Sequence, residues 1–387
     1  MKITKINQKT VPIASKIKNA VIDFSSMTIS VLAVHTDYLK DGKPVIGFGF
    51  NSNGRYSQHG ILADRIIPRL LEADTDDLTE AGTGIIDPFK CWQVMMHNEK
   101  PGGHGERSAA VGAVDMALWD IAAKVERKPL YQLLGERYNG GNYNNRVYTY
   151  AAGGYYYPGK NETMLRDELK KYLDMGFSEC KIKVGGVPLE QDLERIDAAL
   201  AVLGDGGKLA VDANGRFELA RALDFLKAIE PYHLKWYEEP VEPLDFLSTA
   251  AIAQNSQTPI ATGENIFSFV DSRNLIRYGG LKPKRDYLQM DPALSYGLVE
   301  YLKMLKMLRE NGWSAKRCIP HGGHQFGLHL AAGLGLNGNE SYPEVFYPFG
   351  QFAPQMTLEG GEVTLPDEPG IGYELVPEIY KILKTLI

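Results

Sequence analysis

Residues 180–186 read CKIKVGG, a short apolar run that contains two lysines and ends in two glycines. Alternate residues of a β-strand share a face, so Lys181 and Lys183 point to the same side. Two neighbouring ammonium groups repel each other, which disfavours the protonated form of both. A solvated strand face would tolerate this pair. The alternative is a face that lies against an anion or that keeps one lysine neutral.

Runs of this kind recur along the second part of the chain, and helix-like stretches such as PLEQDLERIDAALAVLG separate them. In chain order they are RVYTYAAGG (146–154), CKIKVGG (180–186), LAVDANG (209–215), LKWYEEP (234–240), IATGEN (260–265), YLQMDPA (287–293), CIPHGGH (318–324) and LGLNGNESY (334–342). Strand and helix in alternation predict parallel strands with crossover helices. Eight such runs predict an α/β fold, a (β/α)8 TIM-type barrel over residues 136–351, with a modified first or last unit.

The remaining residues follow other patterns. Residues 1–135 combine an alternating stretch, TISVLAVHTD, a turn-like YLKDGKP and the run VIGFGFNSNGRYSQ, which together predict a hairpin or short meander. The helix-like SAAVGAVDMALWDIAAKV that follows is apolar almost all round, which predicts a buried helix. Residues 352–387 leave the strand–helix alternation, and we expect them to fold back onto the N-terminal domain.

Composition excludes several classes of protein. The 387 residues are 44% hydrophobic and 23% charged, which is ordinary for a globular protein, and the formal charge of −6 without any basic run argues against a nucleic-acid surface. No stretch reaches the roughly 18 apolar residues of a membrane span, and the N-terminus lacks the apolar core of a signal peptide. Three widely spaced cysteines, without a CxxC pair, predict reduced thiols in the cytoplasm.

Polar side chains stand at the end of nearly every predicted barrel strand. They are Lys181, Lys183, Asp212, Glu238, Glu264, Asp291, His321 and Glu340. Barrels of this type carry their chemistry at the carboxyl ends of the strands, so we expect these side chains to face one mouth. Each carboxylate alone could be a helix cap or a solvated loop residue. Three on consecutive strands, Asp212, Glu238 and Glu264, would repel one another without a cation, and their oxygen ligands suit one Mg²⁺.

Two further groups complete a reaction site. Asp291 beside His321 would fix the imidazole tautomer and raise its basicity, although a packed core histidine is the common alternative. His324 and His329 extend an H-x-x-H-x4-H pattern that suggests zinc, but their helical spacing favours helix-start and packing roles. A cation and a second ammonium near Lys183 would lower the pKa of Lys183 enough for it to act as a base.

The predicted groups suit abstraction of the proton next to a carboxylate. The metal and the charged Lys181 would stabilise the resulting enediolate. Lys183 would stand on one side of the substrate and the His321–Asp291 pair on the other. Such a pair can remove and return a proton, or remove a proton and protonate a leaving hydroxyl.

The series KIK, VDANGRF, WYEEP, GEN, MDPA and PHGGH resembles the mandelate racemase subgroup of the enolase superfamily, whose sites pair Lys or His bases with Mg²⁺. The resemblance covers essentially the whole chain. It implies an α+β capping domain of residues 1–135 that the C-terminal tail joins, above a modified barrel. It also implies that the protein is a homo-oligomer acting on a small hydroxy acid.

Longer stretches, NEKPGGHGERS, YAAGGYYYPGK, CIPHGGHQ and GLGLNGNESYP, resemble the D-tartrate dehydratases of that subgroup. This resemblance implies dehydration of D-tartrate to oxaloacetate, with Lys183 as base and His321 as acid oriented by Asp291. Three carboxylates would hold Mg²⁺, and four residues would bind substrate: Lys181, Asn214, Glu340 and Lys100. The alternatives are another acid-sugar dehydratase, an α-hydroxy acid racemase or epimerase, and a catalytically silent barrel.

The groups that meet the far end of the substrate are less defined by the sequence. A second carboxylate needs a cationic partner, and the glycine-rich loop at 98–108 offers Lys100, His104 and Arg107, although a solvated mobile loop is the alternative. The stretch FNSNGRYSQ offers a lid formed by Asn51, Asn53 and Arg55. Its Asn-Gly pair is equally typical of a plain hairpin turn.

Overall fold

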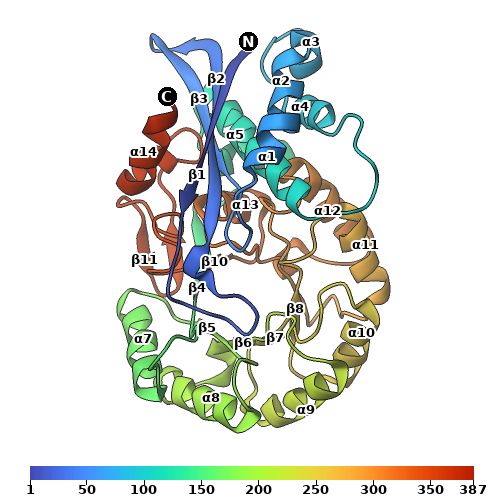
Figure 1. Ribbon diagram of the computed structural model, residues 1–387, viewed down its shortest axis with the longest axis vertical. Coiled ribbons are helices and arrows are strands. Elements are labelled where there is room, and N and C mark those ends of the chain that lie inside the picture. The colour runs from blue at the N-terminus through green and yellow to red at the C-terminus, as the bar shows by residue number, and fades with distance from the viewer.

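An antiparallel three-stranded sheet stands at one end of the molecule (Figure 1). The computed structural model describes residues 1–387. The sheet has the order β1 (Ile3–Pro12), β2 (Thr28–Lys40) and β3 (Lys43–Phe50). Asp41 and Gly42 turn β2 into β3 with positive φ angles of 51° and 77°. The hairpin expected from the sequence is therefore present.

A long buried helix, α5 (Glu106–Val125), packs on this sheet. A Cβ at Gly49 of β3 would lie 2.1 Å from the carbonyl oxygen of Ala113, so the close approach of strand and helix requires glycine there. Shorter helices complete this part, which we call the capping domain. They are α1 (His59–Ile61), α2 (Ile67–Glu72), α3 (Thr75–Leu78), α4 (Pro88–Met95) and α6 (Leu130–Tyr138).

A closed parallel barrel forms the other end of the molecule (Figure 1). Its strands, in spatial order, are β4 (Arg146–Gly153), β5 (Cys180–Lys183), β6 (Leu209–Asp212), β7 (Trp236–Glu238), β8 (Ile260–Thr262), β9 (Tyr287–Leu288), the short segment 318–320, and β10 (Asn339–Ser341). Ile319 donates its backbone N–H to Leu288 at 2.9 Å, Glu340 of β10 donates its own to Pro320 at 3.3 Å, and β10 pairs with β4, so the ring closes. The predicted fold, a modified (β/α)8 barrel with an α+β capping domain, is confirmed.

Seven helices connect the eight barrel strands. They are α7 (Glu162–Asp174), α8 (Leu189–Leu203), α9 (Leu219–Ile229), α10 (Phe246–Asn255), α11 (Phe269–Tyr278), α12 (Leu298–Glu310) and α13 (Gln325–Leu334). The last unit is the altered one: after β10 the chain forms a hairpin of β11 (Thr357–Glu359) and β12 (Glu362–Thr364), and β12 pairs antiparallel with β4. No helix combines the length and the apolar character needed to cross a bilayer.

The C-terminal tail contacts both parts of the molecule. Its hairpin extends the barrel sheet, whereas α14 (Pro377–Leu383) packs against β2 of the capping domain. Leu386 accepts a hydrogen bond from the Asn7 amide at 2.6 Å. The tail thus does return to the capping domain, as expected, but only after adding two strands to the barrel sheet. The boundaries at 135 and 351 stay a prediction.

A fully buried histidine, His329 of α13, joins three segments of the chain. Its Nδ1 accepts the backbone N–H of Tyr131 at 3.1 Å, and its Nε2 donates to the carbonyl of Ile371 at 3.0 Å. Burial lowers its pKa to about 3. His329 is thus a neutral packing histidine with a fixed tautomer, which agrees with its predicted role.

The free energy of unfolding should therefore fall as pH drops from about 6.5 towards 3. In that window the unfolded chain binds a proton at His329 that the folded chain excludes, which costs up to ~1.4 kcal/mol per pH unit. Urea unfolding of wild type and His329→Gln at pH 7.5, 6 and 5 measures this loss, and the variant should show a shallower dependence on pH. Exposed His97→Gln serves as control. Equal pH dependence in all three proteins would contradict the assignment.

Candidate active site

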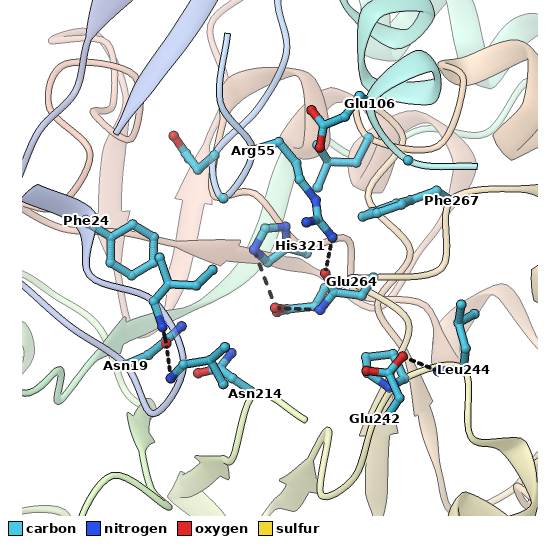
Figure 2. Close-up of a pocket in the computed structure, with 18 of the residues that line it drawn as sticks. Asn19, Phe24, Arg55, Glu106, Asn214, Glu242, Leu244, Glu264, Phe267 and His321 are labelled. Atoms are coloured by element: carbon cyan, nitrogen blue, oxygen red, sulfur yellow. Dashed lines mark hydrogen bonds and ion pairs between the residues drawn. The ribbon is translucent and has the colours of Figure 1, made fainter. Parts of the chain in front are cut away.

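A cavity of about 430 Å³ lies where the barrel mouth meets the capping domain (Figure 2). The barrel contributes Lys183, Asn214, Glu264 and His321 from four different strand ends. The capping domain contributes three segments, 19–24, 53–55 and 104–106. Three members of the polar series predicted at the strand ends, Lys183, Glu264 and His321, therefore line one cavity at the barrel mouth.

Three carboxylates lie close together at the carboxyl ends of the barrel strands. Asp212 ends β6, Glu238 ends β7 and Glu264 follows β8, and one oxygen from each lies within 4.8 Å of the others. Together with Glu340 they face two ammonium groups, so negative charge is in excess. Burial and the nearby Asp212 raise the pKa of Glu238 to about 8. A buried all-oxygen set with excess negative charge fits a hard divalent cation.

The two lysines of β5 both reach these carboxylates. The Nζ atom of Lys181 lies 2.5 Å from Glu238 and 2.7 Å from Glu340. Lys183 forms an ion pair with Asp212. Burial lowers the pKa of Lys183, but the carboxylate of Asp212 outweighs burial and raises it. The lowered pKa expected from the sequence depended on a cation beside Lys183, and the Asp212 partner acts in the opposite direction.

His321 and Asp291 form a hydrogen-bonded pair on the other side of the mouth. Nδ1 of His321 lies 3.0 Å from Oδ2 of Asp291, and Nε2 lies 3.7 Å from Glu264 (Figure 2). Burial lowers the pKa of His321, but the charges of Glu264 and Glu340 and the bond with Asp291 raise it to about 9. These carboxylates favour the protonated imidazole, which can donate a proton into the cavity.

The other predicted substrate-binding residues take different positions. Asn214 lines the cavity, and its amide lies 3.2 Å from Oδ2 of Asp212. Glu340 is fully buried below the cavity, where it accepts from Tyr342 at 2.8 Å and pairs with Lys181. Lys100 is exposed and lies outside the cavity.

Some of the lid residues predicted from the sequence line the cavity, and others do not. Arg55 reaches down from the capping domain, donates to Asn265 at 2.9 Å and stacks 4.6 Å above Phe267 (Figure 2). Asn53 and His104 line the cavity with it.

Arg107 points away from the cavity. It donates to Glu99 and to the hydroxyl of Tyr296, both at 2.8 Å. Its guanidinium therefore holds the glycine-rich loop together instead of facing a ligand.

Sequence reasoning missed several lining residues, among them Asn19, Phe24, Glu106, Glu242 and Phe267. Asn19 and Phe24 lie in the connection from β1 to β2, far along the chain from any barrel strand, and no spacing pointed to them. Glu106 stands in the glycine-rich stretch that the sequence singled out for its cations. It accepts from Gln58 and faces the cavity beside Arg55 (Figure 2).

Comparison with known proteins agrees with this architecture. Residues 164–379, more than half of the chain, match the family described as enolase C-terminal domain-like. Residues 55–135 match the mandelate racemase / muconate lactonizing enzyme N-terminal domain. The chain therefore belongs to the mandelate racemase/muconate lactonizing enzyme family of the enolase superfamily.

Individual relatives are similar over most of their length. An arabinonate dehydratase from Saccharolobus solfataricus is 31% identical over 73% of this chain and 74% of its own. A magnesium-bound racemase from Streptomyces coelicolor superimposes with a TM-score of 0.80, at 26% identity over 99% of both chains. An L-talarate dehydratase from Polaromonas, complexed with Mg and L-glucarate, has a TM-score of 0.76 and 26% identity over 95% of this chain and 92% of its own.

Proposed function

We propose that this protein is a Mg²⁺-dependent hydro-lyase that dehydrates an acid sugar or a related α-hydroxy acid to a 2-keto acid. One observation carries the proposal. Lys183 and His321 face the same cavity from distant strands of the barrel, β5 and the segment 318–320, with Glu264 between them in the wall. A base and an acid placed in this way can act on neighbouring carbons of one bound substrate.

Asp212, Glu238 and Glu264 would hold the metal, because their oxygens converge and the buried charge is unbalanced. When bound, Mg²⁺ supplies positive charge to a substrate carboxylate and so acidifies the proton on the adjacent carbon. Lys181, which no bulk water reaches, adds a second fixed positive charge beside the same carboxylates. Both charges would be in place before the reaction, so the protein would not need to reorganise to provide them.

Two proton transfers by this chain complete the reaction. A cation held by Asp212 would offset the effect of that carboxylate and favour the neutral amine of Lys183. Nζ of Lys183 in this form takes the proton from the carbon next to the carboxylate. Nε2 of His321 gives its proton to the hydroxyl on the next carbon, and the C–O bond breaks with release of water. Asp291 holds Nδ1 of His321 and stabilises the charged imidazole before the transfer. The enol that remains becomes the 2-keto acid.

The names of the relatives favour acid sugars as the substrate class, since similar chains are dehydratases of arabinonate and L-talarate. The cavity of about 430 Å³ is large enough for such polyol acids. Within this class D-tartrate, with oxaloacetate as product, stays our finer proposal, supported by the stretches NEKPGGHGERS and YAAGGYYYPGK. Two of its three candidate cations, Lys100 and Arg107, lie off the cavity, so Arg55 or His104 would have to meet the second carboxylate.

A substrate panel tests the proposal. The enzyme with Mg²⁺ is incubated separately with D-, L- and meso-tartrate, arabinonate, galactonate, galactarate and L-talarate, and 2-keto acid is assayed. Turnover of one or more acids supports the hydro-lyase, and turnover of D-tartrate alone supports the finer proposal. No keto acid from any acid in the presence of bound metal would contradict a dehydratase.

An α-hydroxy acid racemase or epimerase is the second candidate, because the same pair of residues can remove and return a proton. The similar structure described as a racemase favours it. The discriminating readout is solvent deuterium in recovered substrate. Recovered substrate that carries deuterium and has the inverted configuration, without loss of water, would indicate epimerisation in place of dehydration.

Removal of the metal should abolish turnover and lower stability. Treatment with EDTA leaves four carboxylates with two ammonium groups, and Mg²⁺ at 100 times its dissociation constant should restore activity and about 2.7 kcal/mol of stability. Thermal unfolding with and without Mg²⁺ measures this directly. Glu264→Gln should lose most of the Mg²⁺-dependent rise, whereas Glu310→Gln, on the exposed end of α12, should keep it. Equal shifts in both variants would contradict the metal site.

We also propose a homo-oligomer, as the resemblance implies. Size-exclusion chromatography with light scattering tests this directly.

A further inference from the structure

A serine of the capping domain, Ser52, contacts the pair formed by His321 and Asp291. Ser52 follows β3 and is fully buried. Its hydroxyl lies 2.6 Å from Oδ2 of Asp291, the same oxygen that lies 3.0 Å from Nδ1 of His321. We propose that Ser52 is a positioning residue that fixes Asp291, and through it His321, for proton donation to the leaving hydroxyl. This inference rests on the proposed dehydration.

The Ser52 hydroxyl acts as a hydrogen-bond donor to Asp291. Burial raises the pKa of Asp291, but the imidazoles of His321 and His324 hold it well below its usual range, so the carboxylate is ionised. An ionised carboxylate only accepts, so the hydroxyl of Ser52 must donate. A hydrogen bond to a buried charge is among the stronger ones, because water cannot replace a donor that is lost there.

Both oxygens of Asp291 are then fully used. Oδ1 accepts the backbone N–H of Ala293 at 2.8 Å, which is part of the barrel itself. Oδ2 has only Ser52 and His321. The barrel thus fixes one oxygen, and the capping domain fixes the oxygen that orients the imidazole.

The loop that carries Ser52 is anchored on both sides. Asn51 accepts the backbone N–H of Ser30 at 2.7 Å and donates to the carbonyl of Tyr56 at 3.0 Å, which binds the loop to the capping domain. Asn53 donates to the carbonyl of Gly322 at 2.8 Å, next to His321. Ser52 between them has a φ of 61°, a left-handed conformation that is strained for a non-glycine residue and persists only where neighbouring contacts enforce it.

Loss of the hydroxyl should therefore affect the acid more than the base. Lys183 stands on β5 and makes no hydrogen bond with this loop. In Ser52→Ala the dehydration rate should fall about 10- to 100-fold. Proton abstraction at the carbon next to the carboxylate should change by less than about threefold, so more deuterium should enter unreacted substrate per turnover. A merely structural defect would lower both steps together.

Ser52→Gly provides a second variant that also lacks the hydroxyl but fits the left-handed backbone, so it should fold. Ser272→Ala, a buried serine in α11 whose hydroxyl donates only to the carbonyl of Ser268, is the matched control. All are assayed with each acid that the wild type converts. Wild-type dehydration with unchanged partition between exchange and dehydration in both Ser52 variants would overturn the inference.

A readout independent of turnover separates this inference from the proposed function. In full-length protein labelled with ¹⁵N-histidine, the Nδ1–H resonance of His321, assigned with His321→Asn, reports its bond to Asp291. We expect this resonance to move or to broaden by faster solvent exchange in both Ser52 variants and to stay in place in Ser272→Ala. An unmoved resonance in the Ser52 variants would overturn the inference even if no substrate of the panel is converted.

Discussion

Lys183→Ala should lose both dehydration and exchange of the proton next to the substrate carboxylate. Lys183 is the one amine of the chain that lines the cavity, and its Nζ lies against the proposed metal ligand Asp212. Loss of a general base commonly costs 10²- to 10⁴-fold in rate. Assay of 2-keto acid formation and of deuterium in recovered substrate, with the acid that wild type converts, measures both steps.

The control is a lysine that also pairs with a carboxylate but lies at the other end of the barrel. Lys235 precedes β7 and pairs with Glu179, far from the strand ends that form the mouth. Lys235→Ala should keep the wild-type rate, and thermal unfolding in Mg²⁺ should show both variants folded. Exchange at the wild-type rate in Lys183→Ala would remove Lys183 from the role of base.

The barrel was predictable because its strands carry a repeated local signal. Each buried run ends in a polar residue, and a crossover helix of regular length follows, so topology turns a linear spacing into one ring of side chains. Asp212, Glu238 and Glu264 follow from this rule with no knowledge of their neighbours. The buried helix α5 was predictable from a different local signal, since a helix that is apolar on all sides has no face suited to solvent.

The capping-domain part of the site was not predictable in this way. Phe24 lines the cavity from the connection between β1 and β2, Glu106 lines it from the first residue of α5, and Ser52 reaches Asp291 beside it. Their positions depend on how one part packs on the other and not on a periodic pattern. Charge alone was also a poor guide. Arg107 was a reasonable partner for a second carboxylate, but Glu99 and Tyr296 of its own neighbourhood hold it. Arg55, from a stretch equally typical of a plain turn, is the guanidinium over the cavity.

His321→Asn should separate the two steps that Lys183→Ala abolishes together. Asparagine can fill the space of the imidazole, but its amide is not an acid that can protonate the leaving hydroxyl. The rate of dehydration should therefore fall by about 10²- to 10⁴-fold. Lys183 stays in place, and its ammonium exchanges protons with solvent. Deuterium should therefore enter unreacted substrate while 2-keto acid formation is lost, and mass spectrometry of recovered substrate measures this.

The companion variant Asp291→Asn tests how much the carboxylate contributes. It keeps the shape of the side chain but removes the charge that favours the protonated imidazole, so it should resemble His321→Asn in the ratio of exchange to dehydration. His97→Asn, an exposed histidine, should behave as wild type. Loss of exchange together with dehydration in His321→Asn would mean that His321 and not Lys183 removes the proton. The direction of the reaction across the cavity would then be reversed, with Lys183 as the acid.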